Sequence, residues 1–453
     1  MSDEIASKSR IKVFTEGPIL GPLLSFAFPI LAASFLQSLY GAVDMLIVGQ
    51  FSDAAAVSAV STGSNIMNTI TQVFVGISMG TTVLLGQKIG EGKRQEAGLI
   101  TGSSIALFAA IAIAATAIFV TFSNSIARIM QAPSEAFEST VSYIRICSCG
   151  CLFIVAYNLL GSIFRGIGDS KMPLITVAIS SVLNIFGDLL LVAKFSMGAK
   201  GAAIATVVSQ AVSVLLSVQI IRRRGLPFEF KTNFIKWNSN IIKKVLKFGF
   251  PVALQDLLVS LSFLVIAAIV NSLGVTASAG VGIAEKVCAF IMLVPSSFSQ
   301  AMSAFVAQNA GACKPDRAIK ALRYGIGVSL CLGVLIGWFT FFHGDILAGL
   351  FSHDSALIAA AWDYLKAYSI DCILVSVLFC STGYFNGYGR TRFVMIEGIT
   401  GAFGVRIPVA FAMSRIKPVS LFHVGLSTPC ATVIQIILCM IYLMHMRRQQ
   451  KKQ

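Results

Sequence analysis

Long apolar runs recur along the whole 453-residue chain, and each is long enough to cross a bilayer as a single helix. A transmembrane helix needs about 20 consecutive, mostly apolar residues. Twelve such runs are present, and they are centred near Ala33, Phe74, Ala110, Phe153, Leu183, Val208, Leu261, Leu293, Gly333, Leu374, Gly404 and Ile436. The runs near Leu183 and Gly404 carry charged residues inside them. The pattern predicts an all-α membrane protein with twelve transmembrane helices.

The overall composition agrees with this pattern. Hydrophobic residues make up 56% of the chain and charged residues 12%, with a mean hydropathy of +0.82. A soluble domain carries about 25% charged residues, so this chain has too few of them to cover a globule of its size. No apolar run is followed by a small-residue cleavage signal, and we therefore expect the first run to be a membrane span rather than a removable signal peptide.

The basic residues, which give a net charge of +15, are distributed unevenly between alternate loops. One set of loops and both ends of the chain hold most of them: Lys8, Arg10, Lys12, Lys88, Lys93, Arg94, Arg222, Arg223, Arg224, Lys231, Lys236, Lys243, Lys244, Lys247, Lys314, Arg317, Lys320, Arg323, Arg447, Arg448, Lys451 and Lys452. The opposite loops hold Arg128, Lys194, Lys200, Arg415 and Lys417. By the positive-inside rule, this bias predicts cytoplasmic termini in a multi-pass protein of the cell's inner or plasma membrane. Because topology accounts for the charge, we expect no nucleic-acid binding.

The two halves of the chain repeat each other at an offset of about 221 residues. Phe26–Pro29 aligns with Phe248–Pro251 at an offset of 222 residues, and Phe164–Lys171 aligns with Phe385–Arg392 at an offset of 221. Each half contains six predicted helices, an even number, so both halves start on the same side of the membrane as parallel repeats. Such repeats are typical of transporters, with the substrate path between the halves and alternating access by rocking.

The repeat and the basic segment in the middle of the chain predict the domain organisation. We expect a cytoplasmic N-terminal tail at 1–20, a six-helix bundle at 21–223, a cytoplasmic linker at 224–244, a second six-helix bundle at 245–446 and a basic cytoplasmic tail at 447–453. No Walker motif is present, so we expect the transport energy to come from a gradient or a partner.

Polar and acidic residues inside the first-half spans form regular patterns. Gln37, Tyr40 and Asp44 are spaced to share one face of the first helix. Asn184 and Asp188 share a face of the fifth helix in the same way. The remaining polar positions are Thr206 in the sixth helix and a stripe on the second helix formed by Ser61, Asn65, Asn68 and Gln72. Ionisable residues are costly in the hydrocarbon region, so each of them is a functional candidate.

The repeat serves as an internal control for these residues. Asp44, Asn184, Asp188 and Thr206 correspond in the second half to Ile266, Val405, Val409 and about Cys430. A polar set needed only for folding would recur more easily in both halves, so the asymmetry predicts a cation site in the first half. The alternative is that Asp44 or Asp188 simply meets water at a helix end.

The second half has intramembrane charges of its own, namely Asp256, Glu285, Lys286, Asp371 and Arg406. Glu285 and Lys286 are adjacent, so they do not face each other on a helix. Asp256 and Asp371 are candidates to line a second-half cavity. They are equally candidates to neutralise Lys286 or Arg406 in structural pairs.

Nothing in the sequence indicates a cofactor or a catalytic centre. Cys147, Cys149 and Cys151 alternate along a predicted helix and so face different directions, which does not suit one metal ion. No paired His, metal-spaced cluster or activated Ser with a base is visible. We therefore expect no enzymatic activity and no cofactor.

Several short segments together resemble the multidrug and toxic compound extrusion (MATE) family of transporters. They span nearly the whole chain: Ala42–Gly49, Gly86–Gly92, Phe164–Asp169, Gly201–Thr206, Phe305–Ala312 and Arg406–Pro408. In that family an Asp on the first helix, an Asn and an Asp one turn apart on the fifth and a Thr on the sixth form a first-half cation site. The resemblance implies these roles for Asp44, Asn184, Asp188 and Thr206, together with a drug-cavity position for Gln37.

Some branches of the family instead place a coupling Glu on the seventh helix and an Asp on the tenth. Here Val259 stands near the first of these positions, and Asp371 lies about one turn from the second. The sequence therefore departs from the pattern of those branches.

Together these patterns predict a secondary active efflux transporter. Asp44 and Asp188 would load a proton, or Na+ with further oxygen ligands from Asn184 and Thr206, and loading would favour outward release of a bound cation. We expect a small amphipathic organic cation as substrate, a lipid bilayer as environment and a functional monomer. The predicted substrate cavity comprises Gln37, Tyr40, Ser61, Asn65, Asn68, Gln72, Asn158, Asp256 and Asp371.

Three alternatives stay open at this point. A flippase for lipid-linked saccharides, from the same superfamily, would be expected to have a basic cavity, whereas the cavity candidates here are acidic. A major-facilitator carrier also has parallel halves, but its characteristic loop after the second helix is not seen. A membrane enzyme or a non-transporting receptor belongs to a different class, for which no catalytic constellation is visible.

Overall fold

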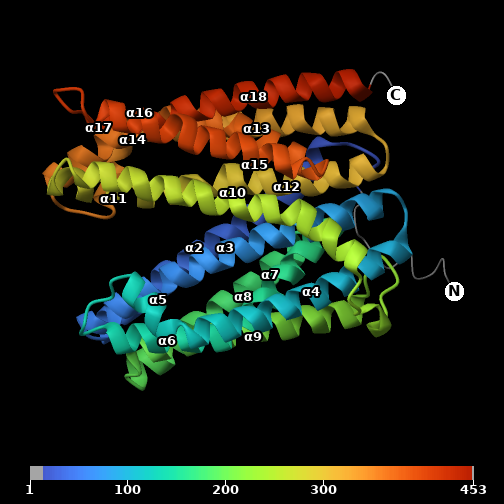
Figure 1. Ribbon diagram of the computed structural model, residues 1–453, viewed down its shortest axis with the longest axis horizontal. Helices are drawn as coiled ribbons and strands as arrows, with labels where there is room; N and C mark the ends of the chain where they lie inside the picture. Colours follow the sequence, from blue (N-terminus) through green and yellow to red (C-terminus); the bar gives the residue numbers. More distant parts are fainter. Residues whose placement is uncertain (1–13, 451–453) are drawn as a thin grey trace. The chain divides into compact units, whose positions relative to one another are not determined.

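The computed structural model describes residues 14–450, and within that range it is helical and contains no strand (Figure 1). This agrees with the all-α prediction. Five of the basic residues assigned to the chain ends, Lys8, Arg10, Lys12, Lys451 and Lys452, lie outside the described residues. The same holds for most of the predicted tail at 1–20 and for the end of the tail at 447–453.

The helices follow one another with short connections. The first half contains α2 (Leu20–Phe51), α3 (Ala54–Gly90), α4 (Arg94–Thr121), α5 (Ser123–Ile129), α6 (Phe137–Cys149), α7 (Cys151–Ile167), α8 (Lys171–Asp188), the π-helix η1 (Leu189–Lys194) and α9 (Gly198–Arg224). After the short 3-10 helix η2 (Thr232–Phe234), the second half contains α10 (Ser239–Asn271), α11 (Val275–Ile291), α12 (Leu293–Gly311), α13 (Pro315–Gly349), α14 (Ser355–Gly387), α15 (Thr391–Ile399), the π-helix η3 (Thr400–Arg406), α16 (Ile407–Met413), α17 (Leu421–Gly425) and α18 (Ser427–Gln450).

The described residues contain 11 helices that are long and apolar enough to cross a membrane, or 12 when α6 and α7 count as one bent span. These two helices meet at Gly150 with a bend of 53°. A Cβ atom at Gly150 would overlap the side chain of Val207 on α9. Glycine at the bend therefore allows α9 to approach closely. With α6 and α7 counted as one bent span, the twelve predicted runs correspond to the spans of the structure.

Both runs with internal charges depart from α-helical geometry. The run near Leu183 continues from α8 into the π-helix η1, and the run near Gly404 continues from α15 into the π-helix η3. A π-turn shifts the backbone hydrogen-bond register and re-aims the side chains that follow it, and such turns are frequent at functional sites.

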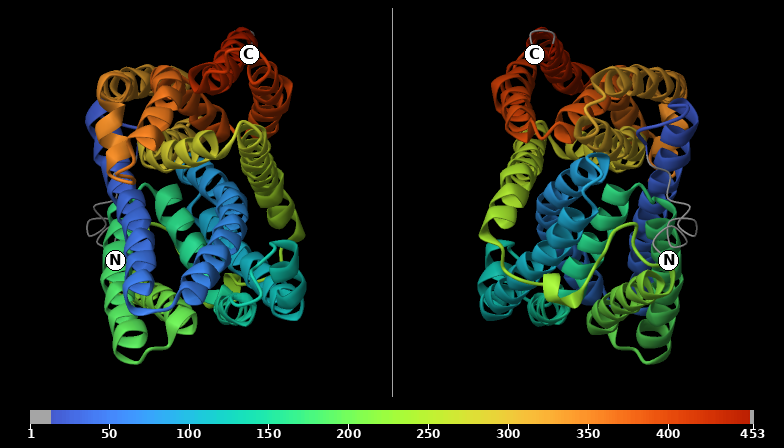
Figure 2. Two further views of the ribbon diagram at one scale, coloured as in Figure 1. Left: turned by 90° about the vertical axis from the view of Figure 1, so that its left-hand side faces the viewer. Right: turned by 90° about the vertical axis from the view of Figure 1, so that its right-hand side faces the viewer.

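The chain divides into two compact units. Unit 1 contains Phe28–Ala253 and Gly311–Cys313, and unit 2 contains Gly17–Ala27, Leu254–Ala310 and the described residues from Lys314 onward. Helix α2 thus begins in unit 2 and continues in unit 1, whereas α10 begins in unit 1 and continues in unit 2. Seen end-on in Figure 2, the helices of each unit pack as a bundle. The domain boundaries proposed from the sequence stay a prediction.

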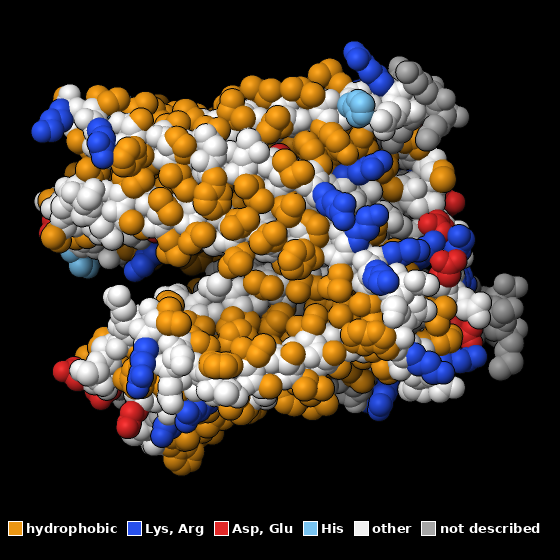
Figure 3. Space-filling view, in the orientation of Figure 1, with side chains coloured by type: hydrophobic (Ala, Val, Ile, Leu, Met, Phe, Trp, Pro, Cys, Tyr) orange, Lys and Arg blue, Asp and Glu red, His pale blue; other side chains and the backbone are white. Residues whose placement is uncertain are grey.

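Each unit has its own packed interior. In unit 1 the largest cluster joins Phe74 of α3, Phe108 of α4 and Ile163 of α7. In unit 2 the corresponding cluster joins Ile266 of α10 and Tyr364 of α14. Outside these clusters, large hydrophobic side chains lie exposed along the middles of the helices, as expected for surfaces that face lipid (Figure 3).

The segment between the halves packs against unit 1. Phe228 is buried, and the backbone of Phe234 lies so close to α4 that a Cβ atom at Gly102 would overlap it. This contact brings the basic linker to the end of unit 1 where Lys88 of α3 pairs with Glu91 at 2.7 Å. The grouping of the basic loops predicted from the sequence is thus seen within unit 1, while cytoplasmic termini stay a prediction.

The start of α3 offers a small test of stability. Asp53 is its N-cap residue, and its Oδ1 accepts a hydrogen bond of 2.8 Å from the backbone N–H of Ala56. Asp53→Ala is expected to lower the unfolding free energy by about 0.5–2 kcal/mol, because that N–H loses its partner. The apparent Tm of the purified protein measures this. Ser170→Ala is the matched control, because Ser170 stands at the N-cap of α8 without a side-chain cap bond.

Candidate functional site

Two acidic residues from distant parts of the chain face each other inside unit 1. Asp44 lies on α2 and Asp188 is the last residue of α8, and their side chains are 6% and 0% exposed. Each carboxyl group interacts directly with the other. Oδ1 of Asp44 and both oxygens of Asp188 nevertheless have no hydrogen-bond donor. Two buried carboxyl groups in contact repel each other unless a proton or a cation lies between them.

The other two residues of the predicted cation set lie beside this pair. Asn184 is one helical turn before Asp188 and is fully buried. Its Nδ2 donates a long hydrogen bond of 3.4 Å to Oγ1 of Thr206 on α9, and its Oδ1 has no donor. We therefore find Asp44, Asn184, Asp188 and Thr206 gathered at the junction of α2, α8 and α9.

The local backbone explains why α8 and α9 approach so closely at this point. Gly187 immediately precedes Asp188, and a Cβ atom there would lie 2.9 Å from the Cβ of Ala205. Ala205 in turn immediately precedes Thr206. Two small residues in contact therefore bring the polar positions of both helices together. Directly after Asp188 the chain enters η1, so the next side chains are re-aimed.

Tyr40 connects the carboxylate pair to further polar groups. Its hydroxyl interacts with the side chains of Gln37, one turn earlier on α2, and Gln210 on α9, and it lies near Asp44. Gln210 was not among the predicted site residues, although it stands one turn after Thr206 on the same helix face. Two predicted cavity residues, Gln37 and Tyr40, thus lie next to the cation set.

The polar stripe of α3 is placed differently. Asn65, Asn68 and Gln72 are exposed, and Ser61 is half-buried. Asn158 of α7 is half-buried, and its Nδ2 donates to the backbone oxygen of Ile154 at 2.8 Å. Within residues 14–450 no side-chain hydrogen bond joins these five residues to Asp44 or Asp188. They remain candidates for a substrate-facing surface rather than for the cation set.

A basic residue that was not among the predicted site residues, Arg165, lies inside unit 1. Arg165 of α7 donates a hydrogen bond of 2.8 Å from Nη2 to Oγ of Ser162, and its chain passes over Gly161. Its buried Nε has no acceptor, and Tyr157 is its ionisable neighbour. Unit 1 therefore holds a cation as well as the carboxylate pair. The alignment of Arg165 with the uncharged Asn386 in the repeat was the signal that could have found it.

The acidic residues predicted for a second-half cavity lie in different surroundings. Asp256 is exposed, whereas Asp371 of α14 is 1% exposed. Asp371 interacts with the hydroxyl of Thr432 and with the guanidinium of Arg406, although neither of its oxygens accepts a well-formed hydrogen bond. Arg406 also donates to Oγ of Ser262 at 3.1 Å. Asp371 thus has a basic partner, which agrees with the structural alternative for this residue.

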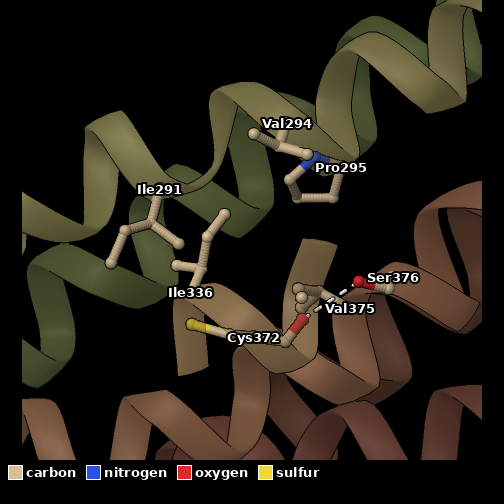
Figure 4. A pocket seen from close by; sticks show the side chains of 8 residues that line it. Ile291, Val294, Pro295, Ile336, Cys372, Val375 and Ser376 are labelled. Carbon is tan, nitrogen blue, oxygen red and sulfur yellow. Dashed lines mark hydrogen bonds between the residues drawn. The ribbon is translucent and has the colours of Figure 1, made fainter. Parts of the chain in front are cut away.

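A pocket in unit 2 lies one turn from Asp371 but has little polar character. It is lined by Ile291, Val294, Pro295, Gly333, Ile336, Cys372, Val375 and Ser376 (Figure 4). The hydroxyl of Ser376 already donates to the backbone oxygens of Ser329 and Cys372, at 2.9 and 3.1 Å. The lining offers no charged group to an organic cation.

Among the described residues, no group of three or more His, Cys, Asp or Glu side chains is arranged to hold a metal ion.

Comparison with known proteins gives a consistent result. The model of the MatE family matches residues 29–190 and 251–412, two segments displaced by 222 residues, which supports the repeat found in the sequence. The probable multidrug resistance protein YoeA of Bacillus subtilis is 28% identical over 428 residues, which cover 91% of each chain. The multidrug export protein MepA of Staphylococcus aureus is 24% identical over 90% of each chain.

Solved structures show the same fold. A crystal structure of MATE in complex with MaL6 superposes with a TM-score of 0.92 at 19% identity, covering 98% of this chain and 100% of the other. A MOP superfamily transporter from Pyrococcus furiosus superposes with a TM-score of 0.92 at 19% identity, covering 98% of this chain and 99% of the other. For that transporter, the reverse polarity of the binding pocket suggests a different function. At this identity the likeness concerns the fold.

Proposed function

Because the chain belongs to the MATE family of membrane transporters, we propose that it exports amphipathic organic cations in exchange for H+ or Na+. As a member of this family it is a multi-pass membrane transporter of small molecules, not an enzyme. The observation that carries the finer proposal is the buried contact between Asp44 and Asp188, whose oxygens lack donors. The relatives with multidrug names support the proposed class of substrate.

The donor set of the site suits either coupling ion. Oxygen atoms from carboxylate, amide and hydroxyl groups are the ligands that hard cations prefer, and Asp44, Asp188, Asn184 and Thr206 offer all three kinds. A proton shared by the two carboxyl groups would remove their repulsion equally well. The role of the set in coupling, and the choice between the ions, are part of the proposal.

Coupling then follows from differential affinity. An ion shifts the equilibrium between inward-open and outward-open states only as far as it binds one of them more tightly. Loading of Asp44 and Asp188 neutralises the charge that a cationic substrate is attracted to, so ion binding favours substrate release. Gln37 and Tyr40 connect ion loading with substrate release, because the Tyr40 hydroxyl interacts with Gln37 and Gln210 and lies near Asp44. We propose that one chain is sufficient for this cycle.

One observation favours the alternative of a flippase for lipid-linked saccharides. Arg165 is a cation inside unit 1 whose Nε has no acceptor, and a pyrophosphate would be attracted to it. The carboxylate pair is better buried than Arg165 and is acidic, which favours a cationic substrate. Transport of a fluorescent organic cation, tested against transport of a fluorescent lipid-linked pyrophosphate, separates the two functions.

Reconstitution into proteoliposomes tests the proposed function. A proton gradient and a sodium gradient are imposed in separate experiments. A fluorescent organic cation is expected to accumulate against its own gradient in at least one of them. Dissipating the imposed gradient should abolish accumulation. Uptake that responds to neither gradient, in liposomes that contain correctly inserted protein, would contradict antiport.

A further inference from the structure

A second buried carboxylate of unit 2 lies outside both the predicted site residues and the proposed coupling site. Glu397 belongs to α15 and is 1% exposed. Neither of its carboxylate oxygens has a hydrogen-bond donor. A buried charged group without a partner is strongly unfavourable, so its presence calls for an explanation.

Amide side chains from two neighbouring helices lie against this part of α15, and one of them contacts Glu397 itself. Gln435 of α18 is 5% exposed and interacts with the Glu397 carboxyl group, while its own Oε1 has no donor. Gln255 of α10 lies against Gly398, where a Cβ atom would come within 2.6 Å of its Nε2. A Cβ atom at Gly401 would likewise overlap the amide of Gln435. The two glycines that follow Glu397, Gly398 and Gly401, thus make room for the two amides.

Among the described residues, no basic side chain compensates the charge of Glu397. Within the described residues, the groups that interact with it are Gln435 and Cys439, both on α18, and neither is a cation. Asp371 in the same unit differs in this respect, because Arg406 is its neighbour. Three oxygens have no donor among the described residues, two from Glu397 and one from Gln435. A cation or a proton bound to these oxygens would compensate the negative charge.

The internal repeat argues against a purely structural role. The residue 221 positions before Glu397 is Thr176, whose hydroxyl donates to the backbone oxygen of its own helix at Met172, 3.1 Å away. Unit 1 thus forms the equivalent helix with a small residue whose hydrogen bond is made locally. The fold does not require a carboxylate here. Glu397 also lies three residues before η3, and π-turns are frequent at functional sites.

We propose that Glu397 and Gln435, with Gln255 beside them against Gly398, form a binding site in unit 2 for a monovalent cation, either Na+ or a proton. A single carboxylate carries one negative charge, and the donor set is far smaller than the 6–8 oxygens that Ca2+ takes. The site is distinct from Asp44 and Asp188, which belong to other helices in unit 1. It does not depend on the proposed function, because cation binding is measured without transport.

The test uses the purified full-length chain with the unit 1 pair neutralised as Asp44→Asn and Asp188→Asn. Its apparent Tm is recorded as NaCl replaces choline chloride, and again as a function of pH without Na+. If Na+ is the ligand, Tm rises with Na+, and adding Glu397→Gln abolishes the rise. If a proton is the ligand, Tm is insensitive to Na+ but depends on pH, and Glu397→Gln removes that dependence.

Three further variants make the result decisive. Gln435→Met keeps the size of the side chain but removes an oxygen ligand, so it should weaken the apparent Na+ affinity about tenfold or more, or shift the pH midpoint. Glu135→Gln, in an exposed loop, should change nothing. Cys439→Ala shows whether the thiol of Cys439, the titratable neighbour of Glu397 on α18, contributes to the pH dependence of Tm. If Glu397→Gln and Gln435→Met are both monodisperse and respond to Na+ and pH as their parent does, no cation binds here.

Discussion

Asp188→Asn is expected to abolish ion-driven export while the protein still inserts into the membrane. Asparagine has nearly the same size as aspartate, so the packing of α8 against α9 is retained. It carries no negative charge, however, and it cannot share a proton with Asp44. The site then no longer distinguishes the loaded from the unloaded state, and the ion gradient loses its influence on the conformational equilibrium.

The size of this effect follows from the energy of coupling between two sites. Coupling free energies of about 1–3 kcal/mol correspond to about 5–150-fold changes in affinity. Because Asp188 is fully buried and directly contacts the other carboxyl group, we expect a loss near the upper end of this range. Asp44→Asn should have the same effect. The double variant should be no worse than either single variant, since residues that act as a unit are not additive.

Export of a fluorescent organic cation from cells, normalised to the amount of protein in the membrane, measures this prediction. Glu135→Gln is the matched control, because it removes a carboxylate from an exposed loop and should leave export unchanged. Full export by both Asp44→Asn and Asp188→Asn would show that the pair does not couple transport to an ion.

The second large effect is expected at Gly80, where α3 meets the first part of α10 in unit 1. A Cβ atom at Gly80 would overlap the backbone oxygen of Val245 and would lie 2.8 Å from the backbone nitrogen of Gly249. Gly249 is equally restricted, because its own Cβ would overlap the backbone oxygen of Ile77. Contacts between backbones cannot be relieved by a change of rotamer. The substitution Gly80→Val must therefore move one helix away from the other.

We expect Gly80→Val to lower the unfolding free energy by about 1–3 kcal/mol, the range for overpacked interiors. Membrane helices associate largely through close packing of small residues, so this contact has few substitutes. The apparent Tm of the purified protein measures the loss. Gly327→Val on α13 is the control, because a Cβ atom there meets no atom within 4 Å. Equal Tm values for the two variants would contradict the close approach of α3 and α10.

The membrane class, the spans and the duplication could all be predicted from the amino-acid sequence. Apolar runs predict spans because the bilayer requires every backbone group to be paired within its own helix, and this requirement is local. The repeat was visible because both halves keep the same turn residues, such as Gly168 and Gly389, which both have positive φ. Helical periodicity also predicted that Asn184 and Asp188 share a face, as a spacing of four residues requires.

The tertiary structure alone decided which side chains from different helices meet. Asp44 and Asp188 are 144 positions apart, and their contact depends on how α2 packs against α8. The same is true of Gln210 beside Tyr40, of Arg406 beside Asp371 and of Gln435 beside Glu397. The break at Gly150 and the two π-helices were equally hidden, because each reflects the approach of another helix or a shift in backbone register. Periodicity along one helix gives the direction of a side chain, whereas its partner is set by packing between helices.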